Sequence, residues 1–232
     1  MISAVIFDFD DTLERWSPAE AEADAQVASL AAKQYGLTQK AFLDAFNAAK
    51  AKYVHKTKRP IDMSRETWIS TALHTLNADY DIPEVKSLED AYWKKILEVS
   101  TLFPGTIEIL QELSTQYTLC MFSDSDGYKP IKLERIKKLC IDQFFKKIVT
   151  SDDVFANKPD PAGWRLIMKQ LQLRPQEIAM VGDHPEMDLL PAKQLGMKTI
   201  WTQEALQRDV HYPFVDKTIL SIMALPDALK KL

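Results

Sequence analysis

Two carboxylates near the N-terminus, Asp8 and Asp10, come directly after the apolar run at residues 4–7, and Thr12 follows them. A short apolar run of this kind is typical of a buried strand in a parallel sheet. Such sheets bind ligands at the carboxyl ends of their strands, and period-two alternation places the two carboxylates on the same side of an extended chain. Converging carboxylates favour a bound cation, although an acidic turn that caps the next helix is the alternative.

Three further polar clusters lie where strands of the same sheet are expected to end. They are Ser123-Asp124 after the apolar run at 120–122, Lys158 before the helix around Trp164, and Gly182-Asp183 with Asp188 after the run at 178–181. Because the carboxyl ends of parallel strands meet at one edge, we expect these clusters to lie together. Acids, a hydroxyl and one lysine in one place indicate a phosphoryl-transfer site.

The elements that position these residues follow from the hydrophobic periodicity. From residue 18 to about 100 the pattern is helical, with helices at 39–54 and 65–77 among others. Beyond residue 103, helices such as 129–138 and 188–195 alternate with short strands expected at 117–122, 148–150, 178–181 and 198–201. The alternation predicts an α/β fold with a doubly wound parallel sheet and a helical bundle inserted after its first strand.

Composition narrows the function classes. The 232 residues carry a formal net charge of -4, which gives no basic footprint for nucleic acid. No apolar stretch approaches the roughly 18 residues of a membrane span, so we expect a cytoplasmic protein that binds neither membrane nor nucleic acid. Cys120 and Cys140 have neither zinc spacing nor the density of a disulfide scaffold, and we expect both to be buried thiols.

The chain resembles the haloacid dehalogenase superfamily, specifically its phosphatases with a helical cap, over essentially its whole length. The family motifs are Asp-x-Asp-x-Thr, a strand-ending Ser or Thr, a Lys, and Gly-Asp followed by a second Asp. They match, in order, Asp8/Asp10/Thr12, Ser123, Lys158 and Gly182/Asp183/Asp188. The resemblance implies a Rossmann-like sheet of order 5-4-1-2-3, a catalytic core formed by residues 1–15 and 102–232, and a cap formed by residues 16–101.

For the acids, the resemblance implies that Asp8 is the nucleophile and forms an aspartyl-phosphate. A carboxylate attacks an anionic ester only where cations neutralise the phosphoryl oxygens, and Mg²⁺ with oxygen ligands suits this task. Asp8 and Asp183 are the expected side-chain ligands, and the resemblance adds the backbone carbonyl of Asp10. The Asp10 side chain would then protonate the leaving group and later activate water, with a pKa that crowding by Asp8 would raise.

The remaining motif residues have supporting roles. We expect Ser123, Lys158 and the backbone N–H of Asp124, at the start of a helix, to bind the phosphoryl group. Asp188 is expected to support the metal-bound waters or Lys158, with an acid at a helix start as the alternative. Thr12 is expected to orient the loop by local hydrogen bonding or to cap the following turn. Position 124 is usually Asn in relatives, and we expect the Asp124 side chain to cap the helix at residue 129 rather than face phosphate. His184 is interpreted as loop structure, because Mg²⁺ prefers oxygen ligands.

The substrate is expected to be a small phosphorylated molecule, bound by a monomer or homodimer. The basic run at residues 50–59 could contact an anionic part of it, although a solvated surface is the simpler interpretation. Trp16 and Trp68 could stack on a ring, with buried packing as the alternative. The rival functions are a 2-haloacid dehalogenase, which would not need Asp10 as an acid, a phosphomutase, and a non-catalytic binding module on the same fold.

Overall fold

A computed structural model describes residues 1–54 and 56–232 of the chain. In this described part, the strands form one six-stranded parallel sheet of order β3-β2-β1-β4-β5-β6. The strands are β1 (Ala4–Phe7), β2 (Thr118–Ser123), β3 (Lys147–Thr150), β4 (Ile178–Gly182), β5 (Lys198–Thr202) and β6 (Lys217–Ile219). The five expected strands have the expected order 5-4-1-2-3. The sixth strand was not predicted, because three residues are too few to show a period-two pattern.

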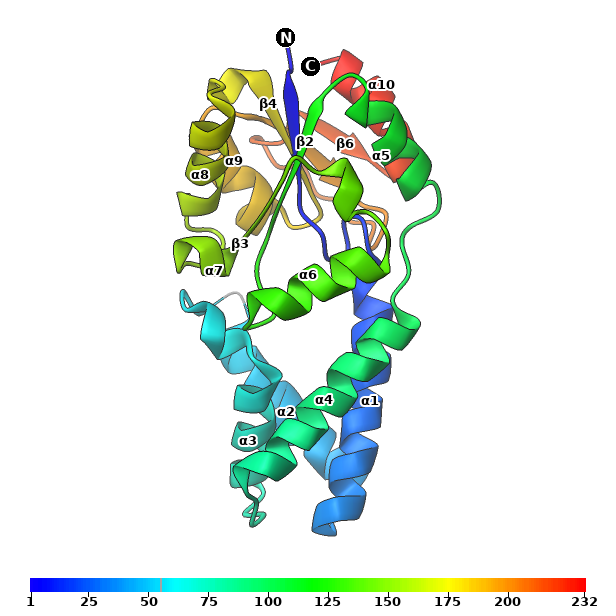
Figure 1. The fold of residues 1–232 in the computed structure, drawn as a ribbon, viewed down its shortest axis with the longest axis vertical. Coiled ribbons are helices and arrows are strands. Elements are labelled where there is room, and N and C mark those ends of the chain that lie inside the picture. Colours follow the sequence, from blue (N-terminus) through cyan, green and yellow to red (C-terminus); the bar gives the residue numbers. More distant parts are fainter. Residues whose placement is uncertain (55) are drawn as a thin grey trace.

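Helices cover both faces of the sheet, as Figure 1 shows. Val5 and Phe7 of β1 pack with α5 (Thr106–Ser114) and α10 (Leu225–Lys230) on one face. Ala4 and Ile6 pack with α8 (Ala162–Leu171) and α9 (Leu190–Gln194) on the other. Successive side chains of a strand point to opposite faces, so the continuous apolar run of β1 is buried on both sides and fixes the strand at the centre.

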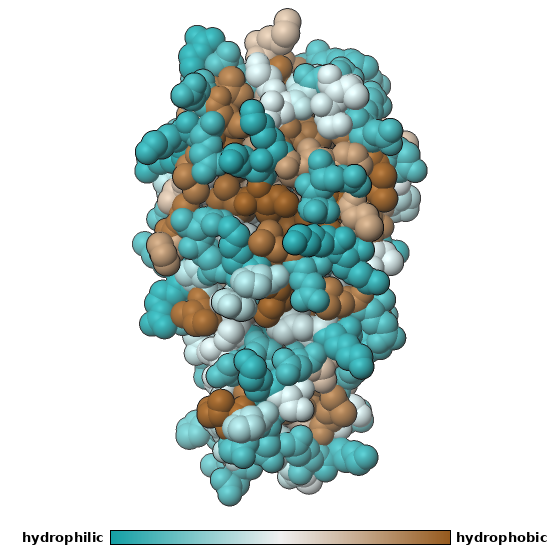
Figure 2. All heavy atoms as spheres, viewed as in Figure 1, coloured by the Kyte–Doolittle hydropathy of each residue, from teal (hydrophilic) through white to brown (hydrophobic). Residues whose placement is uncertain are grey.

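The helical bundle consists of α1 (Trp16–Tyr35), α2 (Gln39–Tyr53), α3 (Arg65–Thr75) and α4 (Ile82–Val99), with a 3₁₀ turn at Pro60–Met63. It has its own hydrophobic cluster, in which α1 packs against α4 and α2 against α3. Thr38, Ser64 and Asp81 cap the starts of α2, α3 and α4 with their side chains. Hydrophilic side chains predominate on the visible face of the bundle in Figure 2.

Two chain segments join the bundle to the sheet, and they are hydrogen-bonded to each other. Glu14 forms an antiparallel bridge with Leu102, and the Arg15 N–H donates to the Thr101 carbonyl at 2.9 Å. The helix α6 (Lys129–Lys138), which matches the range expected from the sequence, lies between sheet and bundle (Figure 1). The bundle therefore lies over the carboxyl edge of the sheet, where the polar clusters were expected.

Contacts at this junction are close. Gly127 precedes α6 with φ +89°, and a Cβ on it would lie 2.4 Å from the backbone nitrogen of Ser64, the cap residue of α3. Asn157 is buried, and its side-chain amide donates to the carbonyls of Thr57 and Arg59 at 3.3 Å. The bundle is thus in direct backbone contact with the loops that follow β2 and precede Lys158.

Two local expectations are corrected. The segment expected as a helix at 188–195 is a π-helical turn (Pro185–Leu189) followed by α9, because Pro191 and the turn before it interrupt a regular α-helix. Cys120 is buried as expected, but Cys140 is exposed, since it lies in a left-handed turn after α6 with φ 57°. The remaining short helices are α7 (Ser151–Val154) and 3₁₀ turns at Asp142–Phe144, Pro175–Glu177 and Ile222–Ala224. Among the described residues, we find no helix with the length and apolarity that crossing a membrane requires.

Candidate active site

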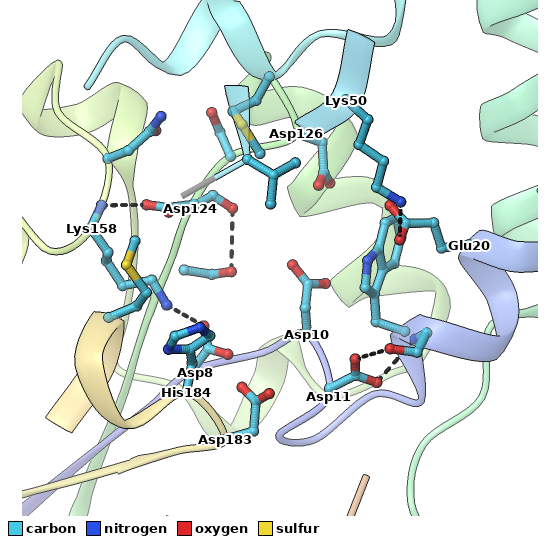
Figure 3. Close-up of a pocket in the computed structure, with 18 of the residues that line it drawn as sticks. Asp8, Asp10, Asp11, Glu20, Lys50, Asp124, Asp126, Lys158, Asp183 and His184 are labelled. Atoms are coloured by element: carbon cyan, nitrogen blue, oxygen red, sulfur yellow. Dashed lines mark hydrogen bonds and ion pairs between the residues drawn. The ribbon is translucent and has the colours of Figure 1, made fainter. Parts of the chain in front are cut away.

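The carboxyl ends of β1, β2 and β4 bring Asp8, Ser123 and Asp183 to one edge of the sheet, as expected. The Asp8 N–H donates to the Val181 carbonyl at 2.9 Å, which continues the β1–β4 ladder to the first residue of the site. These residues line a pocket of about 270 Å³ between sheet and bundle. In Figure 3, Asp8, Asp183 and Lys158 lie at one end of this pocket and Glu20 and Lys50 at the other.

Asp8 is a buried carboxylate with a cation at one oxygen. Its Oδ1 accepts from Lys158 Nζ at 2.6 Å, and its Oδ2 accepts from Thr12 Oγ1 at 3.3 Å. Burial raises the pKa of Asp8 to about 6, against the opposing effect of Lys158. These contacts orient the Asp8 carboxylate. Because it is buried, few water molecules solvate it, which favours its attack on an electrophile whose negative charge nearby cations neutralise.

Lys158 is held between two acids. Its ammonium lies 2.6 Å from Asp8 and 2.6 Å from Asp188, whose second oxygen accepts from the His184 backbone N–H at 3.2 Å. Burial opposes the charge of Lys158, but Asp188 and Asp8 hold its pKa well above the usual value. A Cβ at Gly182 would lie 2.5 Å from an Asp188 oxygen, so only glycine permits this approach. The sequence motif Gly182-Asp183 with Asp188 therefore has a steric reason.

The acids at this edge fit a divalent cation. Oxygen atoms of Asp8, Asp183 and Asp188 all lie within 4.8 Å of one another. Burial raises the pKa of Asp183 well above its usual value, and Asp8 and Asp188 add to the shift by charge repulsion. A cation between Asp8 and Asp183 would relieve this repulsion, and an all-oxygen donor set suits Mg²⁺. Thr12, whose hydroxyl is 3.3 Å from Asp8 and 3.4 Å from Asp183, bridges the two.

Asp124 differs from the expectation. Its Oδ1 accepts from the Lys158 backbone N–H at 2.8 Å, and α6 begins only at Lys129, after Tyr128, with no side-chain cap. Asp124 therefore neither caps α6 nor lies at a helix start. Burial raises the pKa of Asp124 to about 7, which weakens its negative charge at this edge of the sheet. Ser123 is buried at the end of β2, where its hydroxyl donates to the Asp124 carbonyl at 3.3 Å.

Asp10 was expected to be crowded by another acid, but it is surrounded by cations. Its two oxygens accept from Lys132 Nζ and from Arg135 Nη2, each at 2.5 Å. Burial alone would raise the pKa of Asp10, but Arg135 and Lys132 lower it below its usual value. The expectation of a pKa raised by Asp8 is therefore wrong for this arrangement. The cause lies in α6, whose two cations meet an acid about 120 residues earlier in the chain.

Lys132 and Arg135 are functional candidates that the sequence reasoning missed. Both are fully buried, and they also contact Asp126 at 3.2 and 2.7 Å, while Arg135 pairs with Glu14 of the connecting segment. The available signal was their position on the same face of α6 as Ile136, which is buried. Asp126, a further acid that lines the pocket, is paired with both of these cations.

The model of the haloacid dehalogenase-like hydrolase family matches residues 5–202. The chain belongs to this family. The expected fold class is confirmed by the parallel sheet described above and by solved structures that share the fold over 98–100% of this chain.

Relatives of this hydrolase are phosphatases. It is 26% identical to a ribulose-1,5-bisphosphate 5-phosphatase of Halopiger xanaduensis, over 86% of this chain and 84% of that one. It is 31% identical to a glyceraldehyde 3-phosphate phosphatase of Methanocaldococcus jannaschii, over 56% of this chain and 57% of that one. A solved 2-haloacid dehalogenase of Pseudomonas syringae has the same fold, with a TM-score of 0.76, 24% identity and coverage of 100% and 99% of the two chains. The two phosphatase relatives, together with the family match, confirm the expected enzyme class, a phosphatase of this superfamily.

The bundle of this hydrolase supplies the other wall of the pocket. Of the basic run at 50–59, Lys50 lines the pocket, and His55 lies outside the described residues. Trp16 and Trp68 also line it, but each packs against a cation: the Trp16 ring lies 4.0 Å from the guanidinium carbon of Arg135, and the Trp68 ring 4.1 Å from that of Arg65. Trp68 is buried, as the packing alternative expects, whereas Trp16 is half-buried, and the stacking of either ring on a substrate stays a prediction.

His184 follows Asp183 at the mouth of the π-helical turn and lines the pocket. Burial lowers the pKa of His184, so the ring favours its neutral form near neutral pH. Its backbone holds Asp188 through the N–H described above. This agrees with its interpretation as loop structure.

Proposed function

We propose that this protein is a Mg²⁺-dependent phosphomonoester hydrolase that acts on a small phosphorylated metabolite through an aspartyl-phosphate at Asp8. The observation that supports it most directly is the Asp8 carboxylate, which lies 2.6 Å from Lys158 and beside Asp183 at the closed end of the pocket. This arrangement supplies a nucleophile, a fixed cation and a site for a second cation in one place. Those are the parts that attack on a phosphate ester requires.

In the first step, Asp8 attacks phosphorus and the bond to the leaving oxygen breaks. Lys158 and the Ser123 hydroxyl would bind the phosphoryl oxygens, and Asp8, Asp183 and the Asp10 carbonyl would hold the metal. A bound Mg²⁺ supplies charge neutralisation for the phosphoryl group. Asp188 and Thr12 act by positioning Lys158 and the two carboxylates.

Asp10 is proposed to give a proton to the leaving alkoxide and then to take one from the attacking water. Its contact with Lys132 and Arg135 holds it as a carboxylate, which is the form that the second step needs. For the first step it must carry a proton. Because burial by itself raises the pKa of Asp10, we propose that its carboxyl separates from these cations when it turns toward the substrate.

Metal removal tests the proposal. We expect turnover of p-nitrophenyl phosphate with added Mg²⁺, loss of turnover with excess chelator, and recovery when Mg²⁺ is restored. The expected physical reason is the repulsion among Asp8, Asp183 and Asp188, which a cation relieves. Mg²⁺ should also raise the melting temperature of the wild type and not of Asp183→Asn. Full activity in chelator would contradict the proposed metal role.

The bundle is proposed to act as a cap, residues 16–101, over a core formed by 1–15 and 102–232. Gly127→Ala tests this role, because its Cβ would lie 2.4 Å from the Ser64 nitrogen and hold the bundle away from the core. A displacement of this kind is expected to lower kcat/KM on the order of 10²-fold. Steady-state kinetics with p-nitrophenyl phosphate measures the loss.

Gly36→Ala is the matched control for that variant. Gly36 also has a positive φ, +65°, but nothing lies within 4 Å of its would-be Cβ. Both variants should lose about 1–2 kcal/mol of unfolding free energy from the left-handed backbone. Equal activity of the two would show that close packing of the bundle on the core does not matter for turnover.

The dehalogenase remains the sharpest rival, because a solved dehalogenase shares the fold. Displacement of a halide needs no proton donor, so that reaction would leave the Asp10 carboxylate, which Lys132 and Arg135 hold at the pocket, without a chemical role. Turnover of chloroacetate with none of p-nitrophenyl phosphate would favour that rival. A phosphomutase would instead return the phosphoryl group to the substrate.

A further inference from the structure

The bundle side of the pocket carries charges that the proposed chemistry does not use. Glu20 of α1, Lys50 of α2 and Arg65 of α3 line this side, and we call them the distal wall. Figure 3 shows Glu20 and Lys50 across the pocket from Lys158. If the phosphoryl group is bound at Asp8, as proposed above, the rest of the substrate occupies the space between. The charged side chains of the distal wall would therefore face the leaving group.

Lys50 is already paired with carboxylates. Its ammonium is in contact with Glu20 and lies 3.7 Å from Asp24. The side chains of Lys50 and Glu20 are only 21% and 17% exposed. An anion that drew Lys50 away would leave a largely buried Glu20 without that cation, which is unfavourable.

Arg65 also has its contacts within the bundle. Its side chain is 2% exposed, with Nη1 donating to the Met63 carbonyl at 2.9 Å and Nη2 lying 3.7 Å from Glu20. The guanidinium carbon lies 4.1 Å from the Trp68 ring centre and 4.9 Å from that of Tyr92. Arg65 therefore stabilises Glu20 and the aromatic core of the bundle, and it is not positioned to receive an anion.

The core side of the same space is also charge-matched. Asp10 and Asp126 line the pocket, and their partners Lys132 and Arg135 lie buried behind them. Apart from Lys158, which the proposed function assigns to the phosphoryl group, the lysine and arginine residues among the described lining are Lys50 and Arg65, and each has a carboxylate oxygen within 3.7 Å. A carboxylate or second phosphate on the leaving group would thus lie near carboxylates that repel it and near cations that are already paired. A hydroxyl can bond to Glu20 or Lys50 and leave the pair intact.

We infer that the site takes monophosphate esters whose leaving group is small, uncharged and hydroxyl- or carbonyl-bearing, and that the Glu20–Lys50 pair excludes leaving groups with a carboxylate or a second phosphate. The pocket volume of about 270 Å³ agrees with a small leaving group. Selection against an anionic leaving group arises here because Lys50 and Arg65, the cations of the distal wall, are already paired with carboxylates.

The neighbouring cavity is the competing location for an anion. Lys56, Lys58 and Asn157 line this space of about 410 Å³, which shares Lys158 with the pocket. Asn157, hydrogen-bonded to the bundle carbonyls of Thr57 and Arg59, stands at the boundary. Lys56 donates to the Ala51 carbonyl at 2.7 Å, and Lys58 is exposed. We assign the leaving group to the pocket, because Asp10, the proposed proton donor, lines it and not the second cavity.

Two substrates of equal carbon number test the inference. Glycerol 3-phosphate and 3-phosphoglycerate differ at the far end by a hydroxymethyl group against a carboxylate. With Mg²⁺ present, we expect kcat/KM to favour glycerol 3-phosphate by about 10²-fold. Glu20→Gln removes the main partner of Lys50, and this ratio should then fall at least about tenfold through a lower KM for 3-phosphoglycerate.

Asp44→Asn is the control variant. It breaks the exposed Lys40–Asp44 pair on the same helix as Lys50, and the ratio should keep its wild-type value. A wild-type ratio near one, or an unchanged ratio in folded Glu20→Gln, would overturn the inference. So would a preference for 3-phosphoglycerate that Lys58→Met abolishes, because the anion would then bind in the second cavity. Failure to turn over p-nitrophenyl phosphate as well as both esters would instead contradict the proposed function.

Discussion

Asp8→Asn is expected to lower turnover of p-nitrophenyl phosphate by about 10⁴-fold or more while the protein stays folded. An amide nitrogen or oxygen is a poor nucleophile toward phosphorus, so no aspartyl-phosphate can form. The fold should tolerate the change, because burial already disfavours the ionised Asp8 and Lys158 keeps Asp188 as a partner. We expect the unfolding free energy to change by no more than about 2 kcal/mol.

Acid-quenched enzyme, analysed by mass spectrometry during turnover, measures the intermediate directly. The wild type should carry one acid-stable phosphoryl group on the peptide that contains Asp8, and Asp8→Asn should carry none. Asp11→Asn is a suitable control, because both oxygens of the Asp11 carboxylate accept from Ser17, with its backbone N–H donating at 3.0 Å. Wild-type turnover in Asp8→Asn would remove the covalent mechanism.

Asp10→Asn is expected to separate the two chemical steps according to the leaving group. Loss of a positioned proton donor should slow phosphorylation of the enzyme by glycerol 3-phosphate by about 10²–10⁴-fold. Phosphorylation by p-nitrophenyl phosphate should change little, because p-nitrophenolate leaves without a proton. Hydrolysis of the aspartyl-phosphate should slow for both, because it needs the same group as a base.

Rapid-mixing kinetics can resolve this pattern. With p-nitrophenyl phosphate, Asp10→Asn should release a burst of p-nitrophenol close to one equivalent per site, followed by slow turnover. The asparagine keeps the size of the side chain, so its contacts with buried Lys132 and Arg135 can persist in weaker form. Equal slowing of phosphorylation by both esters, without a burst, would show that Asp10 positions the site rather than moves protons.

Confirmed expectations rest on local sequence patterns. The unbroken apolar run of β1 required burial on both faces, and β1 lies at the centre of the sheet with cluster residues alternating between the two sides. The helix expected at 129–138 has those bounds, since its Pro at the second position and its Lys-rich end are strong start and stop signals. The strand β6 and the π-helical turn at 185–189 were not predicted, because each segment is too short to show a detectable hydrophobic period.

Errors at the site arose where a side chain had a distant partner. Asp124 was expected to cap α6, but its oxygen binds the backbone of Lys158, which is remote in the chain. Asp10 was expected to be crowded by Asp8, but two cations of α6 hold it instead. In both cases the prediction considered only partners close in the sequence. The observed partner lies far along the chain, and only the fold brings it into contact.

By itself, the sequence determined which residues meet at the carboxyl edge, because parallel strands end together, Asp8 and Asp183 each follow a strand directly, and Ser123 is the last residue of β2. The tertiary structure decided their charge states and what surrounds them. Lys132 and Arg135 reach Asp10, and Lys50 reaches Glu20, only because α6, α1 and α2 pack where they do. Periodicity assigns a residue to a face of its own helix, but the free energy of a buried charge depends on which other face it meets.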